Sequence, residues 1–466
     1  MNSSITDHVS ATVSHLRGVF NAGKTQPLDY RLEQLAGIQR FLTECQADIY
    51  AALQSDLRKP QQEAFTADIA FVLTEIKLTR KKLASWIKPV RVASPLWAQP
   101  GKSYIYHEPL GVTLVIAPWN FPIQLAIVPL IGAIAAGNCA ILKPSELAPA
   151  TSKVLATLLP KYVDPDCLQV IEGDAAVATA LLAEKFDYIF YTGNGTVGRI
   201  VMEAAAKHLT PVTLELGGKS PCIVDQNCDL EVAARRILFG KFYNAGQVCV
   251  APDYVLVHEA VEETLLACMK KTLQDFYGDD PRNSPDYGRI VNDRHFQRIM
   301  QLLPGSGEIF VGGNADAQER YIAPTILRHV PIDSPVMQEE IFGPILPIFT
   351  VKNIDEAINF VNVRPKPLAL YLFTKDQNVQ NQVLDKTSSG TVAMNNTIMQ
   401  FIASPLPTGG VGASGMGSYH GQASFETFSH RKFVLKQSMI IDPPLVYPPY
   451  TSGKLKWIKR LFLGFF

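Results

Sequence analysis

Short apolar runs alternate with segments of helical periodicity between residues 110 and 214, and this alternation constrains the fold more than any other feature. Apolar runs of this kind suit strands that are buried on both faces of a sheet. Strands separated by helices pair in parallel, because the helix carries the chain back across the sheet so that the next strand can run in the same direction. We therefore predict an α/β domain with a doubly wound parallel sheet. The expected strands are 111–117, 139–142, 168–171, 188–191 and 211–214, and the expected helices are 122–136, 152–159, 175–183 and 198–208.

The flanking segments predict further helices and a second α/β unit. Apolar positions recur at three- and four-residue spacing in 9–20, 31–57 and 61–86, which is typical of amphipathic helices. Residues 103–108, between prolines, read as a strand that belongs either to an arm or to a surface linker. The second unit, from residue 220 onward, is expected to contain helices 229–239 and 258–277 and strands 221–224, 254–257, 309–311 and 345–350.

The composition limits the kind of protein. A chain of 466 residues with 47% hydrophobic residues can build two or three compact units. Equal numbers of basic and acidic residues, 43 of each, argue against a broad nucleic-acid-binding face. The seven cysteines are scattered and form no C-x-x-C pair, so neither a disulfide framework nor a zinc site is expected. Because the N-terminus also lacks the order of a signal peptide, we expect a cytoplasmic protein.

The apolar stretch 125–142 raises the alternative of a membrane span. Pro129, Gly132 and Gly137 divide it, however, and a span needs about 20 uninterrupted apolar residues. A strand–helix–strand unit explains the stretch better.

One cysteine, Cys249, lies in a stretch that suits a nucleophile. Small residues and Gly246 precede it and Pro252 follows, so the expected loop allows a substrate to approach the backbone. A nucleophilic thiol needs this access, together with N–H groups that face the oxygen it creates. Taken alone the signal is weak, because most single cysteines are inert and partly buried.

A glycine-rich turn follows the expected strand 188–191 and opens a helix. Gly193, Gly195 and Gly198 fit the pattern G-x-G-x-x-G, which favours a phosphate-bearing ligand at a helix N-terminus. The usual interpretation would place Glu215, about twenty residues later, on a ribose. A glycine-rich turn without a ligand is the alternative.

Further polar side chains stand next to turns or strand ends. Asn120, within Pro-Trp-Asn-Phe-Pro, can donate its amide to a developing oxyanion. Glu215 lies among apolar residues and glycines, where loss of water would raise its pKa and suit it to proton abstraction. Glu340 stands near Phe342 and a turn. Each feature alone also suits a cap, a turn or a buried polar group, but together with Cys249 they favour a catalytic site.

These segments resemble those of the aldehyde dehydrogenase superfamily, in the family's order and over nearly the whole chain, from about residue 5 to about residue 450. The run after the cysteine, 251–254, and the tail segment 447–450 are similar to the class 3, fatty-aldehyde-type branch, as is the late N-terminal start. The motifs that carry the resemblance are 118–120, 142–146, 214–219, 246–249 and 340–344.

The resemblance implies the aldehyde dehydrogenase fold, with a Rossmann-like cofactor domain, an α/β catalytic domain and a small bridging β-arm that supports a homodimer. The implied parts are a cofactor domain of 1–87 and 107–213, a catalytic domain of 214–395, an oligomerisation arm of 88–106 and 396–438, and a C-terminal tail of 439–466.

The same resemblance implies roles for single residues. Cys249 would attack the aldehyde carbon, and Asn120 with the Cys249 N–H would hold the oxyanion. Glu215 would activate the water that hydrolyses the thioester, which replaces its interpretation as a ribose ligand. Lys143 and Glu146 would contact the adenosine ribose, and since Glu146 would repel a 2′-phosphate, NAD is expected, with NADP as the alternative. Glu340 would contact the nicotinamide ribose with Phe342 close by, and the cofactor cleft would be lined by Trp119, Gly193, Asn194 and Gly198.

We therefore expect NAD(P)-dependent oxidation of aldehydes to carboxylic acids through a cysteine thiohemiacetal and thioester, with no metal. The alternatives are an enzyme that passes the acyl group to coenzyme A, a semialdehyde dehydrogenase and a catalytically silent homologue that acts as a binding protein. Two positions depart from the branch: Val248 stands where it usually has threonine, and Gly195 adds a glycine to the phosphate-type turn.

The segment 452–466 predicts a short amphipathic helix with basic and no acidic residues. Such a helix suits the surface of an anionic membrane, or packing against its own or a partner subunit. On a membrane, the expected substrate is a lipophilic medium- or long-chain aldehyde or an apocarotenal. The residues that share its apolar face are Leu455, Ile458, Phe462 and Phe465.

Overall fold

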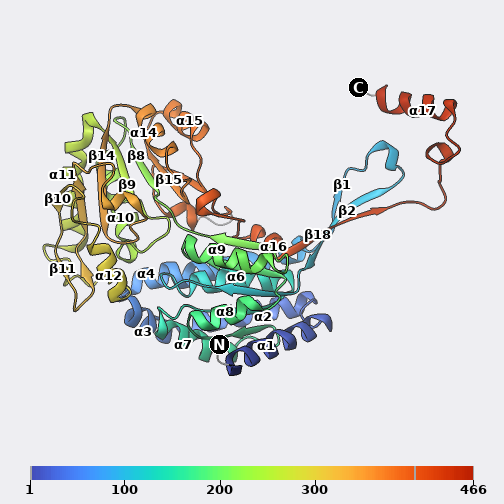
Figure 1. Ribbon diagram of the computed structural model, residues 1–466, viewed down its shortest axis with the longest axis horizontal. Helices are drawn as coiled ribbons and strands as arrows, with labels where there is room; N and C mark the ends of the chain where they lie inside the picture. Colours follow the sequence, from blue (N-terminus) through green and yellow to red (C-terminus); the bar gives the residue numbers. More distant parts are fainter. Residues whose placement is uncertain (1–2, 403–405, 465–466) are drawn as a thin grey trace. The chain divides into compact units, whose positions relative to one another are not determined.

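The computed structural model describes residues 3–402 and 406–464, and its contacts divide the chain into two units (Figure 1). The first unit comprises residues 1–86 and 109–429, and the second comprises residues 87–108 and 430–466. Phe465 of the predicted apolar face lies outside the described residues.

A six-stranded sheet forms one part of the first unit, in the order β17-β7-β6-β3-β4-β5. Five strands are parallel, and the short β17 (Gly415–Met416) pairs antiparallel with β7. The chain moves from β3 towards β5 and then returns to the other side of β3 through β6. This confirms the predicted doubly wound sheet, whose topological switch point lies between β3 and β6. The parallel strands are β3 (Val112–Ile116), β4 (Cys139–Lys143), β5 (Leu168–Val170), β6 (Tyr188–Thr192) and β7 (Val212–Glu215).

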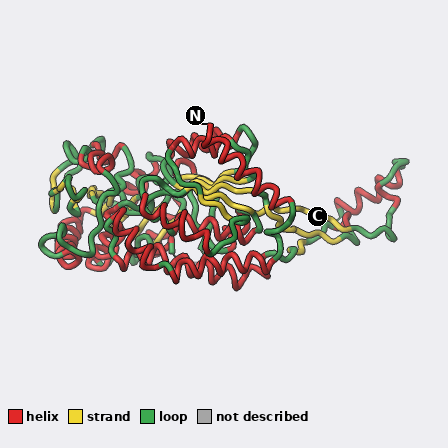
Figure 2. Tube along the Cα trace, turned by 90° about the horizontal axis from the view of Figure 1, so that it is seen from below, coloured by secondary structure: helices red, strands yellow, loops and turns green. Residues whose placement is uncertain are grey.

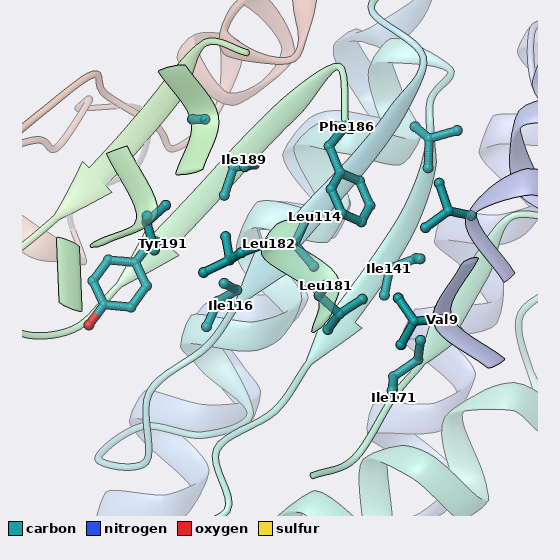
Figure 3. Close-up of a cluster of buried hydrophobic side chains, with 14 of the residues drawn as sticks. Val9, Leu114, Ile116, Ile141, Ile171, Leu181, Leu182, Phe186, Ile189 and Tyr191 are labelled. Atoms are coloured by element: carbon teal, nitrogen blue, oxygen red, sulfur yellow. The ribbon is translucent and has the colours of Figure 1, made fainter. Parts of the chain in front are cut away.

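Helices lie on both sides of this sheet (Figure 2). On one face, α1 (Ser3–Asn21), α8 (Ala175–Ala183) and α9 (Gly195–Ala206) pack apolar side chains against the strands (Figure 3). Leu114 from β3 and Leu181 from α8 are both completely buried in this cluster. Burial of such a side chain contributes about 1.5–3 kcal/mol, so the cluster is a main source of the stability of this sheet.

The other face is covered by α6 (Gln124–Ala136), every residue of which is buried. It contacts β3 and β4 as well as α5 (Phe71–Trp86) and α16 (Gln422–Thr427). Gly137, with a φ of +94°, ends the helix before β4. The apolar stretch 125–142 is therefore a buried helix followed by a strand, as predicted. In the part of the chain that the structure describes, no helix has the length and apolar character needed to cross a membrane.

The N-terminal helices are more divided than the sequence predicts. The second predicted helix is two helices, α2 (Leu28–Glu44) and α3 (Gln46–Leu57), which meet at Cys45, where φ is −101° and ψ is 23°. The third contains a π-helical segment, Ala64–Ala70, directly after α4 (Gln61–Glu63). Segments of this type interrupt helices most often near functional sites.

A second sheet of the first unit has seven strands in the order β10-β13-β14-β9-β8-β15-β16. All neighbours pair in parallel except β10 and β13. The sequence predicts β8, β9, β10 and β14 but misses β13, β15 and β16. The strands of this sheet are β8 (Pro221–Val224), β9 (Tyr254–His258), β10 (Glu308–Val311), β13 (Thr325–Arg328), β14 (Ile345–Val351), β15 (Ala369–Phe373) and β16 (Thr391–Met394), and a separate hairpin pairs β11 (Ala315–Asp316) with β12 (Tyr321–Ile322).

The remaining helices of the first unit connect these strands. They are α7 (Pro149–Leu158), α10 (Leu230–Phe242), α11 (Glu262–Tyr277), α12 (Asp293–Met300), α13 (Pro335–Gln338), α14 (Ile354–Asn362) and α15 (Gln377–Lys386).

The second unit contains a three-stranded sheet and a C-terminal helix. Within it, the ring of Phe462 stacks on that of Trp97 with their centroids 4.9 Å apart. By its contacts, the described part of 396–429 groups with the first unit, since β17 pairs with β7 and α16 packs against α6; the assignment of 396–438 to an arm stays a prediction. The division of the first unit at residue 214 stays a prediction. The elements of the second unit are β1 (Val90–Val92), β2 (Lys102–Pro109), β18 (Ser429–Lys436) and α17 (Ser452–Leu463).

Candidate active site

The predicted site residues of the six-stranded sheet lie at the carboxyl ends of its strands. Trp119 and Asn120 follow β3, and Lys143 ends β4. On the other side of the switch point, Gly193 follows β6 and Glu215 ends β7. Doubly wound sheets bind their ligands at this edge, so four segments that are distant in sequence meet where a ligand is expected.

The cysteine lies in a loop of unusual backbone conformation between α10 and β9. Asn244, Ala245 and Gly246 have φ angles of +51°, +52° and +78°. Left-handed residues other than glycine cost about 1–2 kcal/mol each and persist only where neighbours hold them. Glycine is needed at 246, because a Cβ there would lie 2.3 Å from the carbonyl oxygen of Gly343. The backbone therefore turns tightly just before Cys249.

Gln247 holds this loop from within. Its buried side chain donates from Nε2 to the carbonyls of Asn244, at 3.0 Å, and Arg289, at 2.9 Å. Its Oε1 accepts from the N–H of Val291 at 3.0 Å. The motif that contains Gln247 is visible in the sequence, but nothing there marks residues 289–291 as its partners.

Asn120 reaches the same loop from β3. Its Nδ2 donates to the Gln247 carbonyl at 3.0 Å, and its own carbonyl accepts from Lys59 Nζ and Asn244 Nδ2, both at 3.0 Å. Lys59 is completely buried and is paired with Asp68 at 2.8 Å. The structure therefore joins Asn120 to the cysteine loop directly. Sequence reasoning missed Lys59 and Asp68, because a lysine and an aspartate in a helical region resemble ordinary surface charges.

Cys249 lines a cavity of about 510 Å³. Residues 243–248 before it are buried, whereas Cys249 is partly exposed. Much of the described wall is apolar, with side chains such as Phe121, Leu125 and Met399. A cavity of this size with an apolar wall suits a small organic molecule.

The electrostatic surroundings disfavour ionisation of the Cys249 thiol. Burial raises the pKa of this thiol above its usual range, and charges on Glu340 and Glu215 raise it further. Hydrogen bonds from the backbone N–H groups of Cys249 and Val250 act in the opposite direction. A thiol in this setting needs a nearby base before it can attack an electrophile.

Glu215 has the properties of such a base. Only 3% of its surface is exposed, and its Oε1 has no hydrogen-bond partner among the described residues. Burial raises the pKa of this carboxyl well above its usual value. The backbone is held in place because the Glu215 carbonyl accepts from the N–H of Gly193 at 3.0 Å. A carboxylate with a free oxygen and a raised pKa can take up a proton during a reaction.

Glu340 lies against the turn that follows β7. A Cβ at Gly217 would be only 2.2 Å from Glu340 Oε2, so a side chain at this position would displace the Glu340 carboxylate. Burial raises the pKa of Glu340 to about 8, with a further contribution from the charge of Asp253, while a hydrogen bond from the Gly218 N–H opposes the shift. Asp253 also accepts from the N–H of Ile341 at 2.9 Å, which fixes the segment that carries Glu340.

Trp119 and Phe342 form an aromatic wall near Glu340. Their ring centroids are 5.4 Å apart in an edge-to-face arrangement, and the His295 ring lies 5.1 Å from that of Trp119. Phe342 has a φ of +46°, an uncommon conformation for a bulky residue. The structure thus brings two predicted cofactor residues together and adds His295, for which the sequence gives no signal.

The two residues predicted for the adenosine ribose form an ion pair. Lys143 Nζ lies 2.5 Å from Glu146 Oε2, with the lysine side chain 4% exposed and the glutamate 42%. An ammonium donor next to a carboxylate acceptor suits the two neighbouring hydroxyls of a ribose. The buried hydroxyl of Thr192, at the carboxyl end of β6, has no partner among the described residues. A free polar group at the switch point and this donor set fit a nucleotide cofactor.

The glycine-rich turn also has a structural role. Asn194 is the N-cap of α9, and its Oδ1 accepts from a first-turn N–H at 3.0 Å. A Cβ at Gly198 would lie 3.0 Å from Leu216 Cδ2. Close packing therefore accounts for this position as well as ligand approach does. Among the described residues, no group of His, Cys, Asp and Glu could hold a metal ion.

Comparisons with known proteins show the family of the chain. The model of the "Aldehyde dehydrogenase family" matches residues 2–434. The mouse protein "Aldehyde dehydrogenase, dimeric NADP-preferring" is 52% identical over 432 residues, which cover 93% of this chain and 95% of that one. The rat protein "Aldehyde dehydrogenase family 3 member A2" is 50% identical, covering 97% of this chain and 93% of that one.

Solved structures show the same similarity. A substrate-bound structure of Staphylococcus aureus AldH has a TM-score of 0.95 and 48% identity, and the match covers 97% of this chain and 99% of that one. An NAD-dependent aldehyde dehydrogenase from Sinorhizobium meliloti has a TM-score of 0.86 at 27% identity, with 96% and 89% coverage. The predicted resemblance, the aldehyde dehydrogenase fold and NAD(P)-dependent oxidation of aldehydes are confirmed. The chain belongs to the aldehyde dehydrogenase family.

Proposed function

We propose that this aldehyde dehydrogenase oxidises lipophilic medium- and long-chain aldehydes, with Cys249 as nucleophile, Asn120 as oxyanion donor and Glu215 as base. The observation that carries the proposal is the joint position of these side chains. Hydrogen bonds tie Asn120 to the Cys249 loop, and Glu215 is close enough for its charge to raise the pKa of the thiol. The apolar wall of the cavity beside Cys249 supports a lipophilic substrate.

The first step is attack of the Cys249 thiolate on the aldehyde carbon. A C–S bond forms, and the electron pair of the carbonyl moves to its oxygen. The Asn120 amide and the Cys249 N–H stabilise this oxyanion. The proton that the thiol gives up passes to the free oxygen of Glu215 and from there to solvent, so that Glu215 is ionised again before hydrolysis.

When bound, the cofactor would supply the acceptor for the hydride that leaves the former aldehyde carbon. On the protein side, Lys143 and Glu146 would hold the adenosine ribose and Glu340 the nicotinamide ribose, with Trp119 and Phe342 against the cofactor. NAD is the proposed preference, because Glu146 would repel a 2′-phosphate. Gly193, Asn194 and Gly198 would shape the turn below the cofactor's phosphates.

The last step releases the acid. Glu215 accepts a proton from water, the water oxygen attacks the thioester carbon, and the C–S bond breaks so that Cys249 leaves as a thiolate. A buried base next to the thioester favours water over coenzyme A as the acceptor. A semialdehyde would need a cationic partner, and none of the described residues of the cavity wall is Lys, Arg or His.

Assembly and membrane binding are part of the same proposal. The mouse relative is named dimeric, which supports a homodimer. In α17, the side chains of Leu455, Trp457 and Leu463 are 52%, 64% and 70% exposed, on a helix whose charged residues are all basic. This combination supports peripheral binding to an anionic membrane by a cytoplasmic enzyme. Deletion of 452–466 should abolish binding to anionic liposomes, and unchanged binding would remove this part of the proposal.

The test of the function is NADH formation from hexanal and decanal by the parent enzyme and by Cys249→Ala. We expect decanal to give the higher kcat/KM and the variant to be inactive. Cys222→Ala, a change at a buried cysteine outside the cavity, is the control. Full activity of Cys249→Ala, or an inactive parent, would contradict the proposal.

A further inference from the structure

Two carboxylates lie in the largely apolar wall of the cavity that Cys249 lines. Glu63 and Asp286 both belong to it, and among its described residues there is no Lys, Arg or His. Lys59, whose charge acts on Glu63, is not part of the wall and is paired with Asp68 at 2.8 Å. A molecule in the cavity therefore meets negative charge that no cation of the described wall balances.

Glu63 is held in place and still has an oxygen to spare. Its Oε2 accepts from the N–H of Asn244, in the cysteine loop, at 2.9 Å, whereas Oε1 has no hydrogen-bond partner among the described residues. Burial raises the pKa of Glu63 to about 7, and the charges of Asp286 and Asp68 raise it while Lys59 lowers it. The carboxylate is therefore ionised above neutral pH and neutral below it.

Aromatic rings share this wall with the two carboxylates. Phe239 and Tyr243 lie 5.4 Å apart, and Phe276 and Tyr277 lie 6.0 Å apart, between ring centroids. The charge of Glu63 raises the pKa of both Tyr243 and Tyr277, so it lies near both rings. Aromatic faces attract cations, and cages of rings bind quaternary ammonium groups.

We propose that Glu63 makes the substrate cavity select by charge: it rejects aldehydes with an anionic group beyond the aldehyde and accepts those with an ammonium group. The inference rests on the proposed function, because it assumes that the substrate of Cys249 occupies this cavity. It narrows the substrate class from lipophilic aldehydes to neutral aldehydes and aldehydes with a quaternary or protonated amine at the far end.

Substrates matched in shape test this selection. The cation 4-(trimethylammonio)butanal is compared with 5,5-dimethylhexanal, in which carbon replaces nitrogen, and the anion 6-oxohexanoate with its neutral methyl ester. In the parent enzyme, we expect the cation to match or exceed its neutral isostere in kcat/KM and the anion to fall at least about tenfold below its ester. Activity on the two neutral aldehydes reports the proposed function independently, so failure of one idea is distinguishable from failure of the other.

Glu63→Gln keeps an oxygen that can accept from the Asn244 N–H and removes only the charge. In this variant, kcat/KM for the anion relative to its ester should rise about tenfold. The value for the cation relative to its neutral isostere should fall by a similar factor. Asp286→Asn should shift both ratios in the same direction by less, since Asp286 is exposed. Glu259→Gln, at an exposed carboxylate outside the cavity, should leave both ratios at parent values. Unchanged ratios in Glu63→Gln overturn the proposal.

The pH dependence of the parent enzyme gives a second test that needs no variant. Since Glu63 loses its charge as the pH falls through about 7, the ratio of anion to ester should rise between pH 8.5 and pH 6. Ionisation of Cys249 affects both substrates alike and cancels in the ratio. A ratio that stays constant over this range overturns the proposal.

Discussion

Replacement of Glu215 by glutamine separates catalysis from stability. Glutamine has nearly the same shape but cannot take up a proton, so the loss of a positioned base should lower kcat with hexanal by about 10²–10⁴-fold. The stability of the folded protein, in contrast, should increase. Glu215 is 3% exposed with an unpaired Oε1, and its pKa is raised well above the usual value, so its ionisation opposes folding.

The size of the stability change follows from proton linkage. Above the unfolded-state pKa of about 4.5, the folded chain binds more protons at this group than the unfolded chain, so stability falls as the pH rises towards the folded pKa. The loss is about 1.4 kcal/mol for each pH unit between the unfolded-state pKa and the folded-state pKa. Glu215→Gln removes this loss. The free energy of unfolding of the variant minus that of the parent should therefore increase by up to about 3 kcal/mol from pH 6 to pH 8.

Thermal unfolding at pH 6, 7 and 8 measures this difference. An unfolding entropy of about 2 cal/mol/K per residue gives about 1 °C per kcal/mol for a chain of 466 residues. We expect the melting temperature of the variant minus that of the parent to grow by about 1–3 °C from pH 6 to pH 8. The other buried carboxyls are present in both proteins and cancel. A melting-temperature difference that decreases as the pH rises would refute the role of Glu215 as a buried base. Near-parental activity of the variant would refute it as well.

Three further changes test neighbouring parts of the site. Asn120→Ala removes the oxyanion donor and should lower kcat by about 10²–10³-fold in steady-state assays. Glu146→Gln should raise kcat/KM for NADP relative to NAD by about fivefold, a modest change because Glu146 is 42% exposed; an unaltered ratio would show that Glu146 does not repel a 2′-phosphate. Gly246→Ala places a Cβ 2.3 Å from a carbonyl oxygen at a φ of +78° and should lower the melting temperature by several degrees, whereas a stability equal to the parent's would mean that the loop adjusts freely.

The sequence predicts the nucleotide-binding sheet well because its signals are local. Strand β6 is bounded by polar residues and a glycine-rich turn, and α6 ends at Gly137, so their limits are visible in the order of residues. Strands β15 and β16 were missed, although β15 is completely buried and turn residues precede both strands, because a short apolar run does not distinguish a strand from a segment of buried helix.

For the site, the sequence predicts the reactive residues but not the contacts that position them. Asn120, Glu215 and Cys249 stand out because each belongs to a distinctive run of residues. The contacts that position them join distant segments, such as the N–H of Val291 with Gln247, and no local pattern announces such a contact. The sequence did not predict the charge of the cavity wall either, because Glu63 becomes part of this wall only when its helix packs beside the cysteine loop.

The central claim is that one sulfur atom carries the acyl group between oxidation and hydrolysis. The parent enzyme mixed with hexanal and NAD, quenched in acid within the first turnover and digested, should yield a hexanoyl thioester on the peptide that contains Cys249, at up to one acyl group per chain. An enzyme that forms NADH while this peptide stays unmodified, or that carries the acyl group on another cysteine, would contradict the account.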